Sequence, residues 1–197
     1  THDGQQGLSG LGANGGSAIS WPMFHRDLRH AGYSTSKAPK RGDVIWEYVT
    51  GFEVWSSPAV ADGMIFIGSS DNNVYALNET TGDLIWNYTA GFWFGSSPAV
   101  ADGMVFIGSC DDKVYALNET TGALVWNYTT GNMVWSSPVV ADGMIFIGSD
   151  DKRVYALNET TGAPVWSYKT GSFVESSPAV ANGKVFIGSN DYKVYCF

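Results

Sequence analysis

A period of 40 residues constrains this chain more than any other feature of its sequence. Tryptophan recurs at this interval, at Trp46, Trp86, Trp126 and Trp166. A fixed period of this length indicates one small structural unit copied in tandem. A single copy cannot bury its apolar surface alone, so neighbouring copies must stack on one another.

Each copy contains four short apolar segments separated by turn signals. In the first copy they cover residues 58–61, 64–67, 74–77 and 84–89. The pair Asp62-Gly63 lies between the first two segments and predicts a tight hairpin, because both central residues of a type I′ turn need positive φ. Four antiparallel strands in about 40 residues are typical of a propeller blade, whereas the repeats of a β-solenoid, the alternative, are usually shorter.

The two ends of the repeat region complement each other. Residues 44–50 match the fourth strand of a copy, yet no first three strands precede them. Residues 193–197 match a third strand, with no fourth strand after them. We therefore predict an all-β fold, a β-propeller of four-stranded antiparallel blades with four blades per chain, closed like velcro when the N-terminal strand at 44–50 pairs with 193–197. Such pairing would also cover an open sheet edge.

This closure allows two ring sizes. One chain could close a four-bladed ring on itself, and the small Ser-Ser-Pro-Ala inner strands favour this arrangement. Two chains could instead close an eight-bladed ring with two-fold symmetry. The first arrangement needs no association of chains and is the one that we predict.

The chain divides into three parts by composition. Residues 1–20 are a Gly-rich N-terminal tail, residues 21–43 form a lead-in segment, and residues 44–197 form the four-bladed propeller. The tail has too few apolar residues to fold alone. We expect it to lie on its own propeller or on a neighbouring subunit, which makes a homo-oligomer one expected assembly.

The turn after the third strand carries a specific motif. Residues 76–86, with the sequence ALNETTGDLIW, resemble the tryptophan-docking motif A-x-D-x-x-T-G-x-x-x-W of the PQQ-like β-propeller repeat family, with Asn78 in place of Asp. Residues 116–126 and 156–166 repeat it, and Trp46 matches the tryptophan of a broken fourth copy. The resemblance implies that four residues dock one blade on the next: Trp46, Trp86, Trp126 and Trp166.

The same family includes quinoprotein dehydrogenases and an outer-membrane assembly propeller lipoprotein, and residues 21–27 resemble its lead-in to a first blade. Its enzymes hold the quinone against a tryptophan and a vicinal disulfide, with Ca²⁺ bound nearby by Glu, Asn and Asp. The two cysteines of this chain, Cys110 and Cys196, are far apart in the sequence, and no position matches those ligands. The resemblance therefore implies the fold without the quinone site, and we expect no cofactor and no enzymatic activity.

Two sets of residues could bind a metal ion. His25 and His30 flank Asp27, but no further His or Cys cluster supports a zinc site. An aspartate also recurs once per blade and could form a calcium ring, at Asp71, Asp111, Asp151 and Asp191. An aspartate that caps its own turn is the simpler interpretation of each one, so we predict no metal site.

The charge of the chain limits its partners. The formal net charge is −8 and the pI is near 4.6. The sequence has no basic stripe that could neutralise phosphates, so binding to nucleic acid is not expected. No apolar run reaches the length of a membrane span, so membrane insertion is not expected either.

Two features favour export. The sequence begins at Thr1, and cleavage of a secretory signal is one origin of such an end. Five N-x-T sequons are candidate glycosylation sites, at Asn78, Asn87, Asn118, Asn127 and Asn158. We expect an extracellular or cell-surface location, with the periplasm as the alternative.

The copies differ on one face of the blades. In an up-and-down blade, the loops that lead from a fourth strand to the next first strand share a face with the turns between second and third strands. These loops vary, whereas the turns of the opposite face are nearly identical. Exposed aromatic patches usually mark partners or ligands, although such side chains could also plug a central channel. The candidate contact face comprises Phe52, Trp55, Phe92, Trp93, Phe94, Met133, Trp135 and Phe173.

These observations favour a non-enzymatic exported propeller that acts as an assembly or cell-surface scaffold. It would bind itself, another surface protein or a glycan. A propeller that binds a glycan or a peptide at the aromatic face is one alternative, and a fragment or relative of a quinoprotein redox enzyme is another. Self-association would favour the scaffold, and saturable quenching of tryptophan fluorescence by a small ligand would favour the binding propeller.

Overall fold

The computed structural model describes residues 36–197, and this part of the chain contains strands and turns but no helix. It therefore offers no helical segment that could cross a bilayer. Fifteen strands form four separate antiparallel sheets, which confirms the predicted all-β propeller fold with four blades. The tail at 1–20 and the residues His25, Asp27 and His30 lie outside the described residues.

The first three sheets, blades 1 to 3, contain four strands each, and blade 4 contains three. Blade 1 comprises β1 (Ala59–Ala61), β2 (Met64–Gly68), β3 (Asn73–Asn78) and β4 (Leu84–Thr89). Blade 2 comprises β5 (Ala99–Ala101), β6 (Met104–Gly108), β7 (Lys113–Asn118) and β8 (Leu124–Thr129). Blade 3 comprises β9 (Val139–Ala141), β10 (Met144–Ser149), β11 (Arg153–Asn158) and β12 (Pro164–Lys169). Blade 4 comprises β13 (Ala179–Ala181), β14 (Lys184–Ser189) and β15 (Lys193–Cys196).

Tight hairpins begin every blade, as the sequence predicts. Between β1 and β2, Asp62 has a φ of 47° and Gly63 a φ of 76°. Both central residues are thus left-handed, as a type I′ turn requires. The strands begin and end within one residue of the predicted segments.

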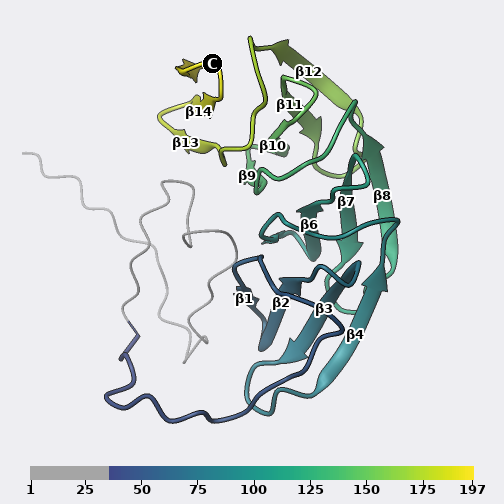
Figure 1. The fold of residues 1–197 in the computed structure, drawn as a ribbon, viewed down its shortest axis with the longest axis vertical. Coiled ribbons are helices and arrows are strands. Elements are labelled where there is room, and N and C mark those ends of the chain that lie inside the picture. Colours follow the sequence, from purple (N-terminus) through teal and green to yellow (C-terminus); the bar gives the residue numbers. More distant parts are fainter. Residues whose placement is uncertain (1–35) are drawn as a thin grey trace, which may run out of the picture.

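The blades follow one another along an open arc, with β1 and β9 on its concave side and β4, β8 and β12 on its convex side (Figure 1). The predicted pairing of residues 44–50 with β15 is not formed within the chain. Residues 44–50 form no strand, and the fourth sheet has only the order β13-β14-β15. The two segments lie at opposite ends of the arc (Figure 1). The predicted four-bladed ring closed by one chain is therefore not observed. Each blade packs on the next in a similar way, and four blades arranged so form an open arc and not a circle (Figure 1).

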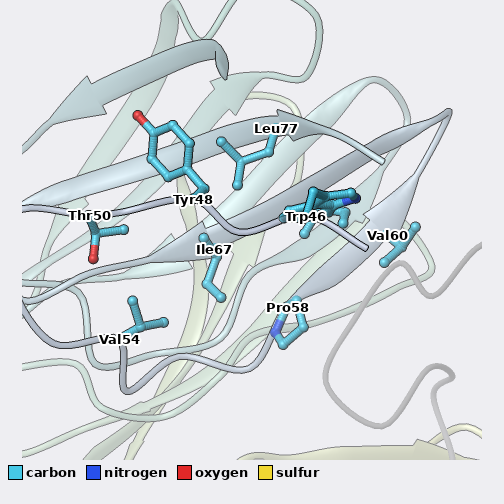
Figure 2. Close-up of a pocket in the computed structure, with 9 residues that line it drawn as sticks. Trp46, Tyr48, Thr50, Val54, Pro58, Val60, Ile67 and Leu77 are labelled. Atoms are coloured by element: carbon cyan, nitrogen blue, oxygen red, sulfur yellow. The ribbon is translucent and has the colours of Figure 1, made fainter. Parts of the chain in front are cut away.

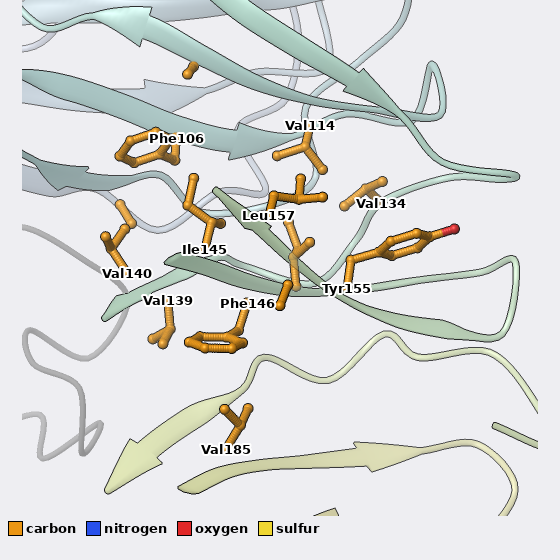
Figure 3. Close-up of a cluster of buried hydrophobic side chains, with 14 of the residues drawn as sticks. Phe106, Val114, Val134, Val139, Val140, Ile145, Phe146, Tyr155, Leu157 and Val185 are labelled. Atoms are coloured by element: carbon orange, nitrogen blue, oxygen red, sulfur yellow. The ribbon is translucent and has the colours of Figure 1, made fainter. Parts of the chain in front are cut away.

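The apolar core lies between blades. Each blade has a downstream face, toward the next blade, and an upstream face, toward the previous one. The downstream face of blade 1 contributes Phe66, Val74 and Ala76, which pack on Val105 and Ile107 of the upstream face of blade 2. A second cluster joins blades 2, 3 and 4, from Phe106 and Val114 through Ile145 and Phe146 to Val185 (Figure 3). Stacking of the blades thus buries apolar side chains that would be exposed on a single blade.

A tryptophan at the convex side docks blade 1 on blade 2 and blade 2 on blade 3, whereas Trp166 of blade 3 packs on Phe197 with ring centroids 5.2 Å apart. The indole Nε1 of Trp86 donates to the backbone carbonyl of Glu119 at 2.8 Å. The ring lies over Gly122, where an added Cβ would approach Cδ2 of the indole to 2.6 Å. Trp126 repeats the contact with Glu159, again at 2.8 Å. The glycine is therefore required both for its positive φ and for the space that the indole fills.

Serines link the inner ends of the blades. The backbone N–H of Ser57 donates to Oγ of Ser97 at 2.9 Å, and the N–H of Ser97 donates to Oγ of Ser137 at the same distance. The N–H of Ser137 then donates to Oγ of Ser177 at 3.0 Å. The recurring Ser-Pro pair thus supplies one hydrogen bond per blade junction, next to the concave side.

Two glycine substitutions separate the docking contact from backbone strain. Gly103 has a φ of 73° with open space around it, and Gly122 has a φ of 70° with the indole of Trp86 against it. We expect Gly103→Ala to lower the free energy of unfolding by about 1–2 kcal/mol, because alanine is strained at positive φ. Gly122→Ala should cost about 1–3 kcal/mol more, because the methyl group also displaces the indole. Urea denaturation of both variants measures the difference, and equal losses would contradict the docking role.

Candidate functional site

Backbone hydrogen bonds hold the variable loops on one face of the blades. In blade 2 the N–H of Cys110, in the turn after β6, donates to the carbonyl of Trp93 at 2.9 Å. The N–H of Phe94 donates to the carbonyl of Ser69, in the corresponding turn of blade 1, at 3.1 Å. The three loops between blades are thus each tied to their own blade and to the previous one, whereas the first loop is tied, among the described residues, to blade 1 alone. We call this surface the loop face; it comprises residues 52–55, 92–95, 132–135 and 172–175 and the turns at 69–72, 109–112, 149–152 and 189–192.

Three aromatic rings form a cluster on the loop face. The rings of Phe92 and Trp93 meet edge to face with centroids 5.5 Å apart, and Trp93 and Trp135 do the same at 5.8 Å. Trp135 lies over Gly95, where an added Cβ would approach the indole to 2.4 Å. Gly95 stands where the neighbouring copies have Trp55 and Trp135. The copies therefore differ here for a packing reason, since a small residue in one loop makes room for a large one in the next.

The predicted contact residues differ in their exposure. Four are exposed on the loop face, namely Phe52, Trp55, Phe92 and Phe173, and Trp55 is the most exposed at 65%. Trp93, Met133 and Trp135 are half-buried.

Phe94 belongs to the core between blades 1 and 2, and its prediction as a surface residue was wrong. It is fully buried, and its ring meets Tyr115 with centroids 5.9 Å apart. The reason is its place in the loop, because the equivalent residues Val134 and Val174 are also fully buried. The third residue of these three loops points into a blade interface, whereas Val54, the third residue of the first loop, is exposed.

A carboxylate lies among these loops in an unfavourable environment. Burial raises the pKa of Asp150 to about 6, and the charges of Glu175 and Asp151 raise it further. Its Oδ1 is buried and has no hydrogen-bond partner among the described residues, and the same holds for Nε1 of Trp93. The thiol of Cys110 is also buried, which raises its pKa to about 11. This part of the loop face therefore combines aromatic surface with unpaired polar atoms.

The aspartates that recur once per blade link neighbouring units through hydrogen bonds, and we call each such set of bonds a latch. Oδ2 of Asp71 accepts hydrogen bonds from the hydroxyl of Tyr75 and from the N–H of Gly51, both at 2.6 Å. Its Oδ1 accepts from the N–H of Asn73 at 3.0 Å, which caps its own turn. Burial and the hydrogen bond to Asp71 raise the pKa of Tyr75 to about 12. Asp111, Asp151 and Asp191 accept the equivalent hydrogen bonds from a tyrosine hydroxyl and from the N–H of a glycine.

The quinone and calcium sites of the family's enzymes do not fit the described residues. Both cysteines are free, and Cys110 and Cys196 are not adjacent in the sequence, so they cannot form the vicinal disulfide. Between residues 36 and 197, no group of three His, Cys, Asp or Glu side chains is placed to hold a metal ion. We therefore derive no chemistry through either group.

The five sequons fall into two structural classes. Asn78, Asn118 and Asn158 are half-buried, and the side-chain carbonyl of each accepts backbone N–H groups of the turn that follows, as at Thr80 and Thr81. Asn87 and Asn127 are exposed on β4 and β8. Glycosylation of any of them stays a prediction, and the exposed pair is the more accessible.

Sequence reasoning missed two recurrent contacts. One is the latch from Asp71 to Gly51, and the other is the hydrogen bond from Ser57 to Ser97. Their signal was present, because each residue recurs every 40 residues. The sequence period, however, does not reveal which residues of neighbouring copies meet.

One family model matches the chain. It is described as outer membrane protein assembly factor BamB, and it matches residues 35–92 and 129–197. No curated protein sequence matches the chain significantly.

Solved structures with a similar fold include natural and designed proteins. BamB from Moraxella catarrhalis is 24% identical with a TM-score of 0.71, and the match covers 79% of this chain and 50% of BamB. Quinohemoprotein alcohol dehydrogenase from Comamonas testosteroni is 19% identical with a TM-score of 0.74, over 86% of this chain and 35% of the enzyme. The computationally designed Ika4 protein is 15% identical with a TM-score of 0.72, over 80% of this chain and 98% of the design. The chain thus spans half or less of both natural proteins, and these similarities show the fold.

Replacement of Asp150 by asparagine should stabilise the protein in a pH-dependent way. The folded-state pKa of about 6 lies above the ordinary value of 3.8, so the protonated form is favoured on folding. The contribution of the protonated Asp150 side chain to the free energy of unfolding is therefore complete below pH 3.8, and it is lost as the pH rises through 6. We expect Asp150→Asn to gain about 1–2 kcal/mol at pH 7, after allowance for solvent screening, and almost nothing near pH 4.

Thermal denaturation at both pH values measures this effect. Asp142→Asn is the matched control, because Asp142 is exposed and the equivalent residue of blade 4 is Asn182. Asn190 likewise occupies the position of Asp150 in blade 4. A gain at pH 7 that is as large for the control as for Asp150→Asn would contradict the prediction.

Proposed function

Because the chain belongs to the family of outer membrane protein assembly factor BamB, we propose that it is a non-enzymatic scaffold propeller that binds another polypeptide through its loop face. The observation that carries this proposal is the exposure of four aromatic side chains on one face, namely Phe52, Trp55, Phe92 and Phe173. Large exposed apolar side chains that gather on one surface usually mark an interaction site. The proposed location is outside the cytoplasm, at the cell surface or in the periplasm.

The pattern of variation between copies supports this assignment. The blade interfaces and the hairpin turns use nearly the same residues in every copy, as their structural roles require. The loop face keeps its backbone through main-chain hydrogen bonds, such as that from Cys110 to Trp93, which do not depend on the side chains. Its side chains are therefore free to serve recognition without loss of the fold.

The chemistry of the loop face fits an extended polypeptide with apolar side chains. Phe92, Trp93 and Trp135 supply adjoining ring surfaces, and aromatic residues are enriched in the cores of protein interfaces. The strands of outer-membrane β-barrels alternate apolar and polar residues, so one such strand could lay its apolar side chains across these rings. The net charge of −8 disfavours an acidic partner.

A glycan is the second candidate ligand. Aromatic rings next to hydrogen-bonding groups also suit a sugar, and the unpaired polar atoms of Trp93 and Asp150 favour such a site. Similarity to the quinohemoprotein dehydrogenase, at 19% identity, is a similarity of fold and adds no catalytic residue. A redox function is therefore not proposed.

Titration of the intrinsic tryptophan fluorescence tests the polypeptide proposal. The probe is a synthetic ten-residue peptide that alternates Phe, Val or Tyr with Ser or Thr, and the second probe is maltohexaose. We expect saturable quenching by the peptide and about tenfold weaker binding after Trp55→Ala combined with Phe92→Ala, since interface aromatics carry much of the binding energy. Val125→Ala, on the convex side at β8, is the control and should bind as the unchanged protein does.

The outcomes of this titration separate the hypotheses. Saturable quenching by maltohexaose, without binding of the peptide, would replace the polypeptide partner by a glycan. Equal loss of peptide affinity in the Val125 control would place the peptide away from the loop face. No response to either probe would leave the loop face without the proposed function.

A further inference from the structure

Three segments of the loop face meet at the turn between β10 and β11. The N–H of Asp150, in this turn, donates to the carbonyl of Met133, in the loop before blade 3, at 2.9 Å. The N–H of Val174, in the loop before blade 4, donates to the carbonyl of Ser149, in the same turn, at 3.2 Å. The turn that carries Asp150 is thus held between two neighbouring loops.

This arrangement places a row of aromatic rings beside two carboxylates. Trp135 ends the first of the two loops, and its ring meets that of Trp93 with centroids 5.8 Å apart. Phe92 continues the row, with its centroid 5.5 Å from that of Trp93. Glu175 ends the second loop, and its charge acts on Asp150. We call these five residues the loop-face strip, and each of them has a described blade on either side.

The charge around the loop-face strip is almost wholly negative. Each of the four turns on the loop face contains an aspartate, and Lys152 is the only basic residue among the loop-face residues. Asp111 and Asp191 form salt bridges with lysines, whereas Asp150 and Glu175 form none with any described residue. The two carboxylates of the strip therefore lack a counter-charge in the described part of the chain.

The surroundings of Asp150 disfavour its charged form. Its side chain is half-buried, and Oδ1 accepts no hydrogen bond from the described residues. Burial raises the pKa of Asp150 to about 6, and the negative charges of Glu175 and Asp151 raise it further. The nearby thiol of Cys110 adds no positive charge, since burial raises its own pKa to about 11. A cation placed here from outside would stabilise the ionised carboxylate.

We propose that the loop-face strip binds an arginine side chain that follows a row of apolar side chains in an extended polypeptide. A guanidinium group suits both parts of the strip, because it can stack on an indole ring and pair with a carboxylate at the same time. A lysine ammonium group would pair with the carboxylates but has no plane to stack. This inference rests on the proposed function, since it names the residue that the polypeptide partner would present to Asp150 and Glu175.

The spacing of the rings suits an extended chain. Side chains on one face of a strand are about 6.6 Å apart, because each residue rises about 3.3 Å and every second side chain shares a face. The ring centroids of the strip are 5.5 Å and 5.8 Å apart, which is close to this spacing. Apolar residues at every second position would thus each cover one ring. An arginine two positions further on would lie on the same face of the peptide, toward Asp150.

The apolar pocket of blade 1 lacks this combination of rings and charges. It has a volume of about 280 Å³ and lies between residues 44–50 and blade 1 (Figure 2). Trp46, Tyr48 and Ile67 are among its lining residues, and none of the residues that line it is charged. An arginine would lose its hydration in this pocket without gaining a carboxylate, so the pocket does not compete with the loop-face strip for this residue.

Two matched peptides test the proposal. Both carry a fluorescent label and alternate Phe, Val or Tyr with Ser or Thr over ten residues. The last apolar position holds arginine in one peptide and citrulline, its neutral isostere, in the other. We expect the arginine peptide to bind about tenfold more tightly at pH 7.5, as measured by fluorescence anisotropy, because only the charged side chain gains both the cation–π contact and the ion pair.

The carboxylates are identified by substitution. Asp150→Asn combined with Glu175→Gln should bind both peptides equally and should keep the affinity of the unchanged protein for the citrulline peptide, which shows that the variant is folded. Asn190 occupies the position of Asp150 in blade 4, so the amide fits the turn. Asp142→Asn is the matched control, because Asp142 is exposed in a hairpin on the opposite face, and it should keep the tenfold preference.

The preference for arginine should also depend on pH. Asp150 is mostly ionised above pH 6 and mostly protonated below it, so binding of a cation strengthens as the pH rises through 6. The tenfold preference should therefore fall to about twofold at pH 5. The affinity for the citrulline peptide should change little over this range.

The outcomes separate this inference from the proposed function. Saturable binding of both peptides with equal affinity would overturn the arginine site and leave the polypeptide scaffold standing. Binding of neither peptide would overturn both. A preference for arginine that persists in the double variant would place the arginine away from Asp150 and Glu175. Loss of the preference in Asp142→Asn would reduce it to an effect of net charge and would contradict the proposed site.

Discussion

The docking of a tryptophan on a glycine of the next blade is the contact on which the arrangement of blades depends. Trp86 anchors its indole by a hydrogen bond to Glu119, and Gly122 supplies the space that the ring fills. Because this contact recurs from blade 1 to blade 2 and from blade 2 to blade 3, it helps to turn a sequence period of 40 residues into a curved row of blades. The same contact holds Trp46 against blade 1, where no paired strand supports it.

The repeat made most of the fold predictable. The Asp62-Gly63 hairpin and the strand boundaries follow from turn chemistry and apolar runs, which are local properties. Phe94 was misplaced because its burial depends on the neighbouring blade, and an aromatic residue in a loop carries no local sign of that. The open arc was not predicted for a similar reason. The angle between blades arises from packing at the junction, and the sequence pattern specifies the residues of a junction without its angle.

The loop face combines a fixed backbone with variable side chains. Hydrogen bonds such as that from Cys110 to the carbonyl of Trp93 hold the loops regardless of side chain, whereas the latch between Asp71 and Gly51 needs an aspartate in every blade. Substitutions therefore accumulate where the main chain maintains the geometry. The half-buried side chain of Asp150 has a raised pKa because of burial and the charge of Glu175, so its charged form is disfavoured in the folded state. A destabilising group in a surface loop is more typical of a recognition site than of a structural one.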